Sequence, residues 1–297
     1  MYTNAGLGQI LPTFLTDPIA KTTGDQLAPE MVKEFGGVYP GKSVNDYVTE
    51  VGKAVAVKAK RQDIPYKFTV LADDKVVNAF ALGNGQIFVT RAILDVLENE
   101  AELAGVLGHE VGHVNKRHIN KSIEERLGFT ALAELAKALV GKRLSAENQE
   151  TLTKATDLGF NLAVNGFSRG HESEADEDGV DLSARAGYDP HGIVGVMGKF
   201  QSMEKGKEPS GIEYYLRSHP LARHRVADTT ARINARYPGI GGRVGTAKYL
   251  AIIRGEEIGG AVAQVWETIK PYAVPAGIVA GSLGLAWVLT KVLVPSK

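Results

Sequence analysis

His109, Glu110 and His113 stand in the order His-Glu-Val-Gly-His, inside a segment rich in apolar residues and glycine. Residues four apart on an α-helix project from one face, so the two imidazoles can reach a single Zn²⁺ ion. Glu110 lies one step round the helix, where it can touch a metal-bound water without binding the metal. With seven histidines in 297 residues, chance would give this pattern in on the order of one chain in 100. The spacing therefore predicts that His109 and His113 bind zinc and that Glu110 acts as a base.

The histidine pair needs a third ligand, and the chain contains no cysteine, so histidine and carboxylate side chains are the remaining strong candidates. Glu172 and Asp176 are four residues apart on a predicted helix that starts after Ser168, and they share a face of it. One carboxylate could bind the metal while the other orients a ligating histidine. Acidic residues near a helix start are usually partners of the helix dipole. Beside a histidine pair that lacks its third ligand, the metal-binding interpretation is favoured.

The other histidines stand in less informative surroundings. His219 precedes Pro220, which favours an extended conformation, so its loop could point the imidazole into a cleft. His118 follows His113 by five positions, whereas the motif with a third histidine ligand needs six. We therefore expect His118 at a solvent-facing helix end. Surface or helix-cap positions are also predicted for the remaining three, His171, His191 and His224.

A helix from Glu98 to about Lys116 must position the histidine pair. Acidic residues at its start suit the helix dipole, and apolar residues at helical spacing form a core stripe: Leu103, Val106, Leu107, Val111 and Val114. The histidines lie about 115° from the middle of that stripe, so a second face of the helix can line a cleft. Each glycine in a helix interior costs about 1 kcal/mol. Three occur here (Gly105, Gly108 and Gly112), which indicates a close approach to the backbone, with the wall of the site as one candidate.

Strands are predicted before this helix, at 68–71, 76–81 and 86–90. Gly83-Asn84-Gly85 predicts a hairpin between the last two, so we expect a small antiparallel sheet. The sheet could be purely structural, or its exposed edge could pair with an extended peptide by β-strand addition. Periodic apolar residues between 29 and 60 predict one or two packing helices.

Four motifs follow one another along the chain: His109-Glu110-x-x-His113, Ser168-Arg169-x-x-Glu172-x-x-Ala175-Asp176, Ala186-Gly187-Tyr188-Asp189-Pro190, and His219-Pro220 followed by Arg225. Together they resemble the motifs of zinc metallopeptidases related to CAAX prenyl endopeptidase, HtpX and Oma-type mitochondrial proteases. The resemblance covers roughly Tyr47 to Tyr237. It implies an α+β, mainly α-helical fold: a zincin-like metallopeptidase domain whose small antiparallel sheet precedes the metal-binding helix.

The resemblance also implies a role for each site residue. His109, His113 and Glu172 would be the zinc ligands, with Glu110 as the base and Asp176 as the orienting carboxylate. His219 would lie near the substrate carbonyl and help to stabilise the oxyanion, and Arg225 would support the site electrostatically. The stretch Asn78-Ala79-Phe80-Ala81 would form the strand that binds substrate.

The composition restricts the partners. Lys plus Arg and Asp plus Glu both number 34, so no net charge favours nucleic acid. Residues 271–290 are uncharged and long enough to cross a bilayer core of about 30 Å, although two prolines and three glycines weaken that segment. We expect a metallopeptidase domain over 1–255 and a hydrophobic tail over 256–297. The tail either attaches the chain to a membrane through 271–290 or docks on the domain as a helix.

The expected activity is hydrolysis of interior peptide bonds, with one Zn²⁺ per chain and polypeptide substrates. A bacterial cell envelope is the favoured location, and lysines on both sides of 271–290 leave the side of the membrane open. The first sixteen residues contain no Lys or Arg and do not form a signal peptide as they stand. One competing hypothesis is a chaperone or binding module in which zinc is a structural staple, but a staple does not need Glu110. Another is a latent protease whose tail or loop covers the cleft.

Overall fold

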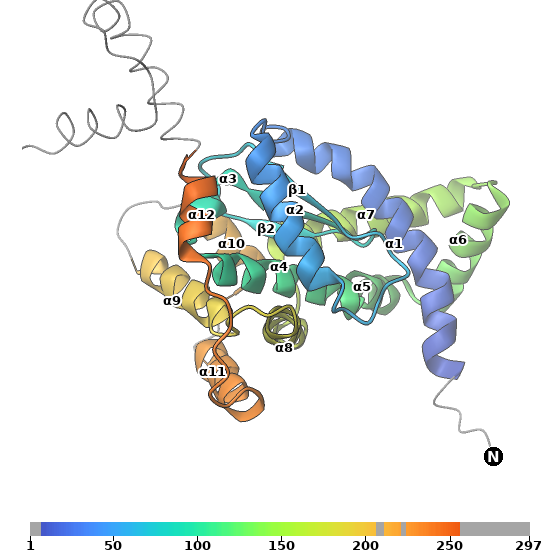
Figure 1. Ribbon diagram of the computed structural model, residues 1–297. Coiled ribbons are helices and arrows are strands. Elements are labelled where there is room, and N and C mark those ends of the chain that lie inside the picture. Colours follow the sequence, from blue (N-terminus) through green and yellow to red (C-terminus); the bar gives the residue numbers. More distant parts are fainter. Residues whose placement is uncertain (1–6, 206–210, 221–223, 256–297) are drawn as a thin grey trace, which may run out of the picture. The chain divides into compact units, whose positions relative to one another are not determined.

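The computed structural model describes residues 7–205, 211–220 and 224–255, with side chains described from residue 16 onward. Within them the chain is mainly helical with one small sheet (Figure 1), so the predicted α+β, mainly α-helical class is confirmed. The strands are β1 (Lys67–Leu71), β2 (Ala79–Ala81) and β3 (Gln86–Thr90). The helices are α1 (Leu7–Glu34), α2 (Lys42–Ala56), α3 (Arg91–Val96), α4 (Glu100–Asn115), α5 (His118–Leu127), α6 (Phe129–Gly141), α7 (Ala146–Asn165), α8 (Arg169–Arg185), α9 (Gly192–Glu204), α10 (Glu213–Ser218), α11 (Arg225–Arg236) and α12 (Thr246–Ile253).

The sheet has the strand order β1-β3-β2. β2 and β3 form the predicted antiparallel hairpin, and Gly85 in its turn has a φ of 84°, a conformation that glycine adopts without strain. β1 runs parallel to β3, so the sheet is mixed and the expectation of a purely antiparallel sheet is wrong. The hairpin fixes only the pairing of β2 with β3. β1 reaches the far side of β3 through a connection that no local turn signal announces.

α4 carries the histidine pair and lies close to its predicted bounds. The Asn99 side chain accepts a hydrogen bond from the Glu102 backbone N–H at 2.9 Å, which caps the helix, and acidic residues occupy the first turn. At the other end Arg117 has a φ of 58° and a ψ of 40°, a left-handed conformation that is uncommon outside glycine. This residue breaks the helical path after α4, and α5 begins at the next position.

α4 packs between the sheet and helices α8 and α9 (Figure 1). A Cβ added at Gly105 would lie 2.8 Å from the backbone N of Ile193 in α9. One added at Gly108 would lie 3.1 Å from the Cα of Gly179 in α8. The close approach predicted from the glycines is confirmed. The approaching elements are two packed helices, however, and not the wall of a cleft.

The predicted packing helices between 29 and 60 correspond to the end of α1 and to α2. α2 buries the predicted apolar face, formed by Val44, Tyr47, Val48, Val51 and Val55. The apolar residues of α1 also pack with those of α5, α6 and α7, which come later in the chain. These layers leave α4 with its core face buried and its histidine face turned toward α8.

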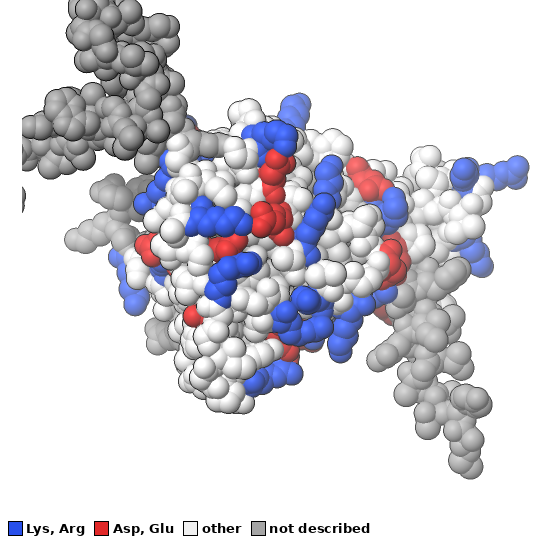
Figure 2. Space-filling model, in the orientation of Figure 1, with Lys and Arg blue, Asp and Glu red and all other residues white. Residues whose placement is uncertain are grey.

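Basic and acidic side chains are interspersed on the face shown in Figure 2, in keeping with the equal totals of the sequence. By its contacts the chain separates into two compact units, Met1–Ile252 and Ile253–Lys297. The predicted tail, 256–297, and its uncharged segment 271–290 lie outside the described residues. Among the helices that are described, none combines the length and the apolar composition needed to cross a bilayer.

Candidate metal centre

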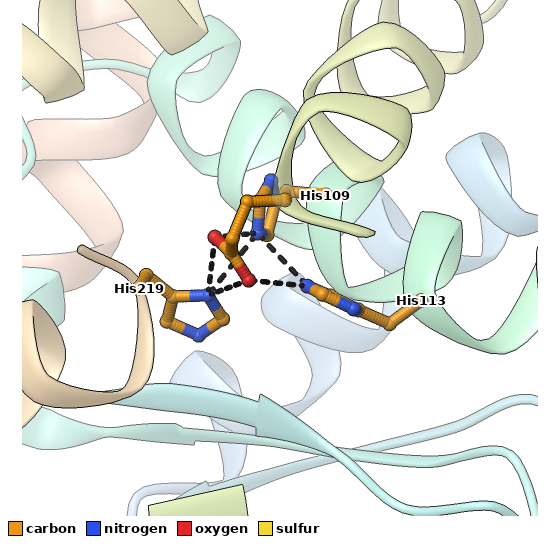
Figure 3. A group of neighbouring side chains, drawn as sticks. His109, His113 and His219 are labelled. Atoms are coloured by element: carbon orange, nitrogen blue, oxygen red, sulfur yellow. Dashed lines mark hydrogen bonds and ion pairs between the residues drawn. The ribbon is translucent and has the colours of Figure 1, made fainter. Parts of the chain in front are cut away.

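Four side chains from three parts of the fold meet at one point. His109 and His113 come from α4, Glu172 comes from the first turn of α8, and His219 follows α10. One ligand atom from each lies within 4.8 Å of all the others, and all four residues are 2% exposed. Figure 3 shows the three imidazoles converging. These four residues are called the donor group below.

The spacing of the donor atoms fits a tetrahedral ion. Ligand atoms 2.0–2.2 Å from a tetrahedral metal are separated from one another by roughly 3.3–3.6 Å. His109 Nε2 lies 3.1 Å from His113 Nε2 and 3.2 Å from His219 Nδ1. The two oxygens of Glu172 lie 3.4 Å from His113 Nε2 and 3.5 Å from His109 Nε2. Two imidazoles and a carboxylate at these separations can hold one metal ion without a large rearrangement.

The charge around the donor group also favours a cation. Three buried carboxylates, those of Glu110, Glu172 and Asp176, face one buried guanidinium, that of Arg225. Burial alone lowers the pKa of His109, but hydrogen bonds to Asp176 and Glu172 outweigh burial and raise the pKa to about 10. Burial alone raises the pKa of Glu172, yet the neighbouring histidines hold the pKa well below its usual value. The metal-free site therefore keeps a proton where a metal ion would replace it.

Asp176 and Arg225 lie directly behind His109. His109 Nδ1 is 3.0 Å from Asp176 Oδ1, so the ring donates there and turns Nε2 toward the donor group. Arg225 donates to both oxygens of Asp176, at 2.8 and 2.7 Å, and its Nη1 is 3.1 Å from Glu172 Oε2. The structure thus brings together the two carboxylates that the sequence placed on one face of a helix.

Glu110 is buried beside the donor group without joining it. Its Oε1 makes no hydrogen bond within the described part of the chain, and the nearest basic atom is His219 Nε2 at 3.5 Å. A buried carboxylate oxygen is costly when it lacks a donor. Among the described residues, this oxygen is left without a hydrogen-bond donor.

The comparison with known proteins agrees with this geometry. Residues 42–233 match the sequence profile of Peptidase family M48. The chain belongs to this family. It is 30% identical to the metalloprotease LoiP of Escherichia coli (strain K12) over 222 residues, which are 74% of this chain and 83% of LoiP. The resemblance found in the motifs is thereby confirmed.

Two other relatives are longer than this chain. The beta-barrel assembly-enhancing protease of Yersinia pestis is 29% identical over 199 residues, 66% of this chain and 40% of that protein. The mitochondrial metalloendopeptidase OMA1 of Arabidopsis thaliana is 34% identical over 173 residues, 58% of this chain and 33% of OMA1. The chain thus spans less than half the length of either. M48 peptidases are metal-dependent, and the buried donor group of this M48 chain fits a metal site.

His219 occupies a place in this M48 site that the sequence did not predict. Its Nδ1 belongs to the donor group, 3.2 Å from Glu172 Oε2, and its Nε2 lies 3.3 Å from the carbonyl oxygen of Ala79. We expected an open cleft with His219 beside the substrate carbonyl. In the structure the imidazole supplies the fourth nitrogen or oxygen atom of the donor group.

The predicted substrate strand lies beside His219. β2 is the edge strand of the sheet, as β-strand addition requires, but Asn78, Ala79 and Phe80 are all buried, so the expected exposure is wrong. The Phe80 ring stacks on Phe88 with centroids 5.1 Å apart and belongs to the core. The backbone of β2 is covered as well, because Ala79 as a whole residue is 0% exposed and its carbonyl oxygen lies 3.3 Å from His219 Nε2.

The prediction for His118 is wrong, because its side chain is 0% exposed. Its Nδ1 lies 2.9 Å from His113 Nδ1, and its Nε2 lies 3.2 Å from Glu174 Oε2. A residue five positions along an unbroken helix would point away from His113. The left-handed Arg117 turns the chain back, and nothing in the sequence marks that residue for this conformation.

The other three histidines differ among themselves. His191 and His224 are exposed near helix starts, as predicted. His171 is partly buried, and its ring stacks on that of His118 with centroids 4.2 Å apart. The sequence therefore missed His118 and His171 as neighbours of the metal-binding histidines.

Proposed function

We propose that this chain is a zinc-dependent endopeptidase in which His109, His113 and Glu172 hold the ion. The observation that carries the proposal is the tetrahedral spacing of the donor group beside the buried Glu110 oxygen, which accepts no hydrogen bond from the described residues. Zinc in such a site polarises a carbonyl and lowers the pKa of water to about 7. Two neutral imidazole nitrogens and a carboxylate are the ligand types that zinc commonly takes.

The chain's own residues would carry the proton and the developing charge. Glu110 takes the proton of the attacking water and passes it to the leaving amine, a role that contributes typically 10²–10⁴-fold in rate. His219 donates from its imidazole to the oxyanion. Asp176 and Arg225 hold His109 in place. Once His219 has moved away from Ala79, the backbone of Asn78, Ala79 and Phe80 would pair with the substrate as an added strand. Such pairing recognises peptide backbone regardless of side chains.

His219 must leave the donor group for this reaction. Catalytic zinc sites keep one position for water, whereas sites closed by four protein ligands are structural. The described arrangement therefore corresponds to a latent form of the enzyme, and it supports the hypothesis of a loop that covers the site. His219 stands between α10 and Pro220, outside any helix, so its imidazole could leave the fourth position without a change in α4 or α8.

The substrates and the location form part of the proposal. One relative is named for enhancing beta-barrel assembly, which points to protein quality control in a bacterial cell envelope. We propose polypeptide substrates there, a peptidase domain over 1–255, and membrane attachment through 271–290 in the tail 256–297. The non-catalytic zinc module remains the rival, and a cleavage assay separates the two.

Glu110→Gln tests the function directly. The variant should bind as much zinc as the wild type but lose cleavage of casein by about 10²–10⁴-fold, because the amide cannot accept the proton. Metal analysis and fluorescent-casein assays measure the two properties on the same preparation. In the wild type, a chelator should abolish cleavage and added zinc should restore it. Undiminished cleavage by Glu110→Gln would remove this residue from the mechanism. Zinc-loaded protein that cleaves casein neither as the full chain nor as a chain ending at Arg254 would favour the rival module.

A further inference from the structure

His118 makes two contacts that together span the space between His113 and α8. The imidazole is fully buried at the first position of α5. One nitrogen, Nδ1, lies 2.9 Å from His113 Nδ1, and the other, Nε2, lies 3.2 Å from Glu174 Oε2. Figure 3 shows one nitrogen of His113 turned toward the donor group and the other turned away from it. His118 contacts the nitrogen that is turned away.

The hydrogen-bond partners of His118 determine where the protons lie in the row formed by His113, His118 and Glu174. Glu174 also meets the Lys121 ammonium at 3.2 Å, and a carboxylate in such a pair can only accept hydrogen bonds. His118 must therefore donate from Nε2, which leaves its Nδ1 as an acceptor. His113 then donates from its own Nδ1. The remaining nitrogen of His113, Nε2, carries a lone pair directed at the donor group, as a metal ligand requires.

Ring stacking fixes the planes of both imidazoles. The Phe167 ring stacks on His113, with centroids 4.2 Å apart and planes inclined by 24°. The His171 ring stacks on His118, with centroids 4.2 Å apart and planes inclined by 14°. Both stacking residues stand in or just before the first turn of α8, and the same helix carries Glu172 and Glu174. The segment that supplies the ligating carboxylate thus also holds the two rings.

We propose that His118 is a positioning residue for the metal centre, which links the carboxylate of Glu174 to His113 and fixes the proton on His113 Nδ1. His109 receives the same support directly from Asp176, 3.0 Å from its Nδ1. His113 lies against His118 instead of a carboxylate, and the second imidazole extends the reach of Glu174. The inference rests on the proposed metal site, and zinc binding by the wild type tests that site separately.

Two amide substitutions separate this role from simple packing. His118→Asn places an amide oxygen near the position of Nδ1 and can still accept from His113. His118→Gln places its amide near the position of Nε2 and leaves His113 without an acceptor. Zinc affinity of the full-length chain, measured by competition with a chromophoric chelator, should fall by about 10–100-fold for His118→Gln and by less than about tenfold for His118→Asn. Equal affinities for the two variants would overturn the proposal.

Glu174→Gln gives a second test without changing a buried side chain, because Glu174 is 43% exposed. The amide oxygen can still accept from His118 Nε2, but it lacks the negative charge that raises the basicity of the linked imidazoles, so zinc affinity should again fall, by about tenfold. Lys121→Ala is the matched control, since it removes the other partner of Glu174 and should leave the affinity close to that of the wild type. Unchanged affinity in Glu174→Gln would contradict the link.

The proton positions can be read in the zinc-bound wild type, which does not depend on any variant folding. Long-range ¹H–¹⁵N spectra distinguish protonated from unprotonated imidazole nitrogens. The proposal expects His118 protonated at Nε2 only and His113 protonated at Nδ1. The opposite tautomer of His118 would overturn it. Failure of the wild type to bind zinc would instead overturn the proposed function, and this inference with it.

Discussion

The side chains of Glu172, Glu174 and Asp176 project from α8 within five positions, and each contacts different partners. Glu172 joins the donor group, Asp176 meets His109 and Arg225, and Glu174 meets His118. Buried charges are costly unless they are paired and hydrogen-bonded. The two buried carboxylates, Glu172 and Asp176, each have cationic or imidazole partners, whereas Glu174 stays partly exposed.

Asp176→Asn should lower the free energy of unfolding of the metal-free protein by about 3 kcal/mol, because it leaves the buried Arg225 without its bidentate carboxylate. Asp181→Asn is the matched control on the same helix. It removes an ion pair to Arg236, whose side chain is 48% exposed, and should cost less than about 1 kcal/mol. Urea unfolding followed by circular dichroism measures both. Equal losses in the two variants would contradict a special role for the buried pair.

The buried pair also makes stability depend on pH. Burial alone raises the pKa of Asp176, but hydrogen bonds from His109 and Arg225 outweigh burial and hold the pKa below its usual value of 3.8. A carboxyl group whose pKa is lower in the folded than in the unfolded protein stabilises the fold. This contribution is fully present above the unfolded pKa and is lost as the pH falls through the folded pKa. The stability difference between wild type and Asp176→Asn should therefore be largest at about pH 5–6 and shrink at lower pH as Asp176 takes up a proton. It should also shrink as the pH rises toward 10, because Asp176 raises the pKa of His109 and that contribution is lost when His109 gives up its proton. A difference that widens on acidification would contradict this assignment.

At the scale of elements, the site depends on how closely α8 and α9 approach α4. The glycines of α4 allow this approach, and the backbone of Ile193 would lie within 2.8 Å of a Cβ at Gly105. A methyl group there cannot be accommodated by rotating a side chain, because the contact is with backbone atoms. α4 and α9 would have to move apart.

Gly105→Ala should therefore destabilise the protein by about 1–2 kcal/mol, since overpacking costs typically 1–3 kcal/mol and outweighs the gain in helix propensity of about 1 kcal/mol. Gly198→Ala in α9 is the control, because no heavy atom lies within 4 Å of its added Cβ. That variant should be more stable than wild type by about 0.5–1 kcal/mol. Denaturant midpoints compare the two. A stabilising Gly105→Ala would show that the contact between α4 and α9 is looser than described.

The turn between α4 and α5, just after the histidine pair, also depends on contacts with another helix. Arg117 in the left-handed conformation ends one helical path and starts the next. Its guanidinium is held by Asp17 of α1, which also accepts a hydrogen bond from Asn120 at 2.7 Å. A strained backbone residue persists when its surroundings fix it. α1 thereby stabilises the turn that brings His118 behind His113.

At the scale of the whole molecule, a bound ion should stabilise the fold. Binding to the folded state alone adds about 4 kcal/mol when free zinc exceeds its Kd 1,000-fold. For a unit of this size the melting temperature should rise by roughly 8–16 °C. Magnesium should give little shift, because it prefers oxygen ligands. Scanning calorimetry with zinc, magnesium and a chelator measures the effect, and identical melting in all three would contradict a metal bound at the donor group.

The proposed tail can be tested with the whole chain. Full-length protein should float with lipid vesicles in a density gradient, because about 20 apolar residues suffice to enter a bilayer. A chain that ends at Arg254 should remain with the soluble fraction. Flotation of both proteins, or of neither, would argue against attachment through 271–290. Increased casein cleavage by the shortened chain would show in addition that the tail restrains the enzyme.

Regular local geometry explains what could be predicted. The four-residue spacing of His109 and His113 fixes their common face on any helix, and the spacing of Glu172 and Asp176 does the same. Glycine and asparagine between two apolar runs similarly specify the hairpin of β2 and β3. These predictions depend only on residues close together in the chain, so the sequence alone determined them, along with the mainly helical class.

Contacts between distant elements were decided only by the tertiary structure. The entry of His219 into the donor group, the burial of β2 and the parallel pairing of β1 with β3 depend on how helices and strands cross, which no local spacing encodes. His118 depends in addition on one left-handed residue whose conformation is fixed by partners far along the chain. The sequence determined which residues could bind a metal. The packing of α4, α5 and α8 decided which side chains surround it, because only packing sets the distances between groups more than 50 residues apart.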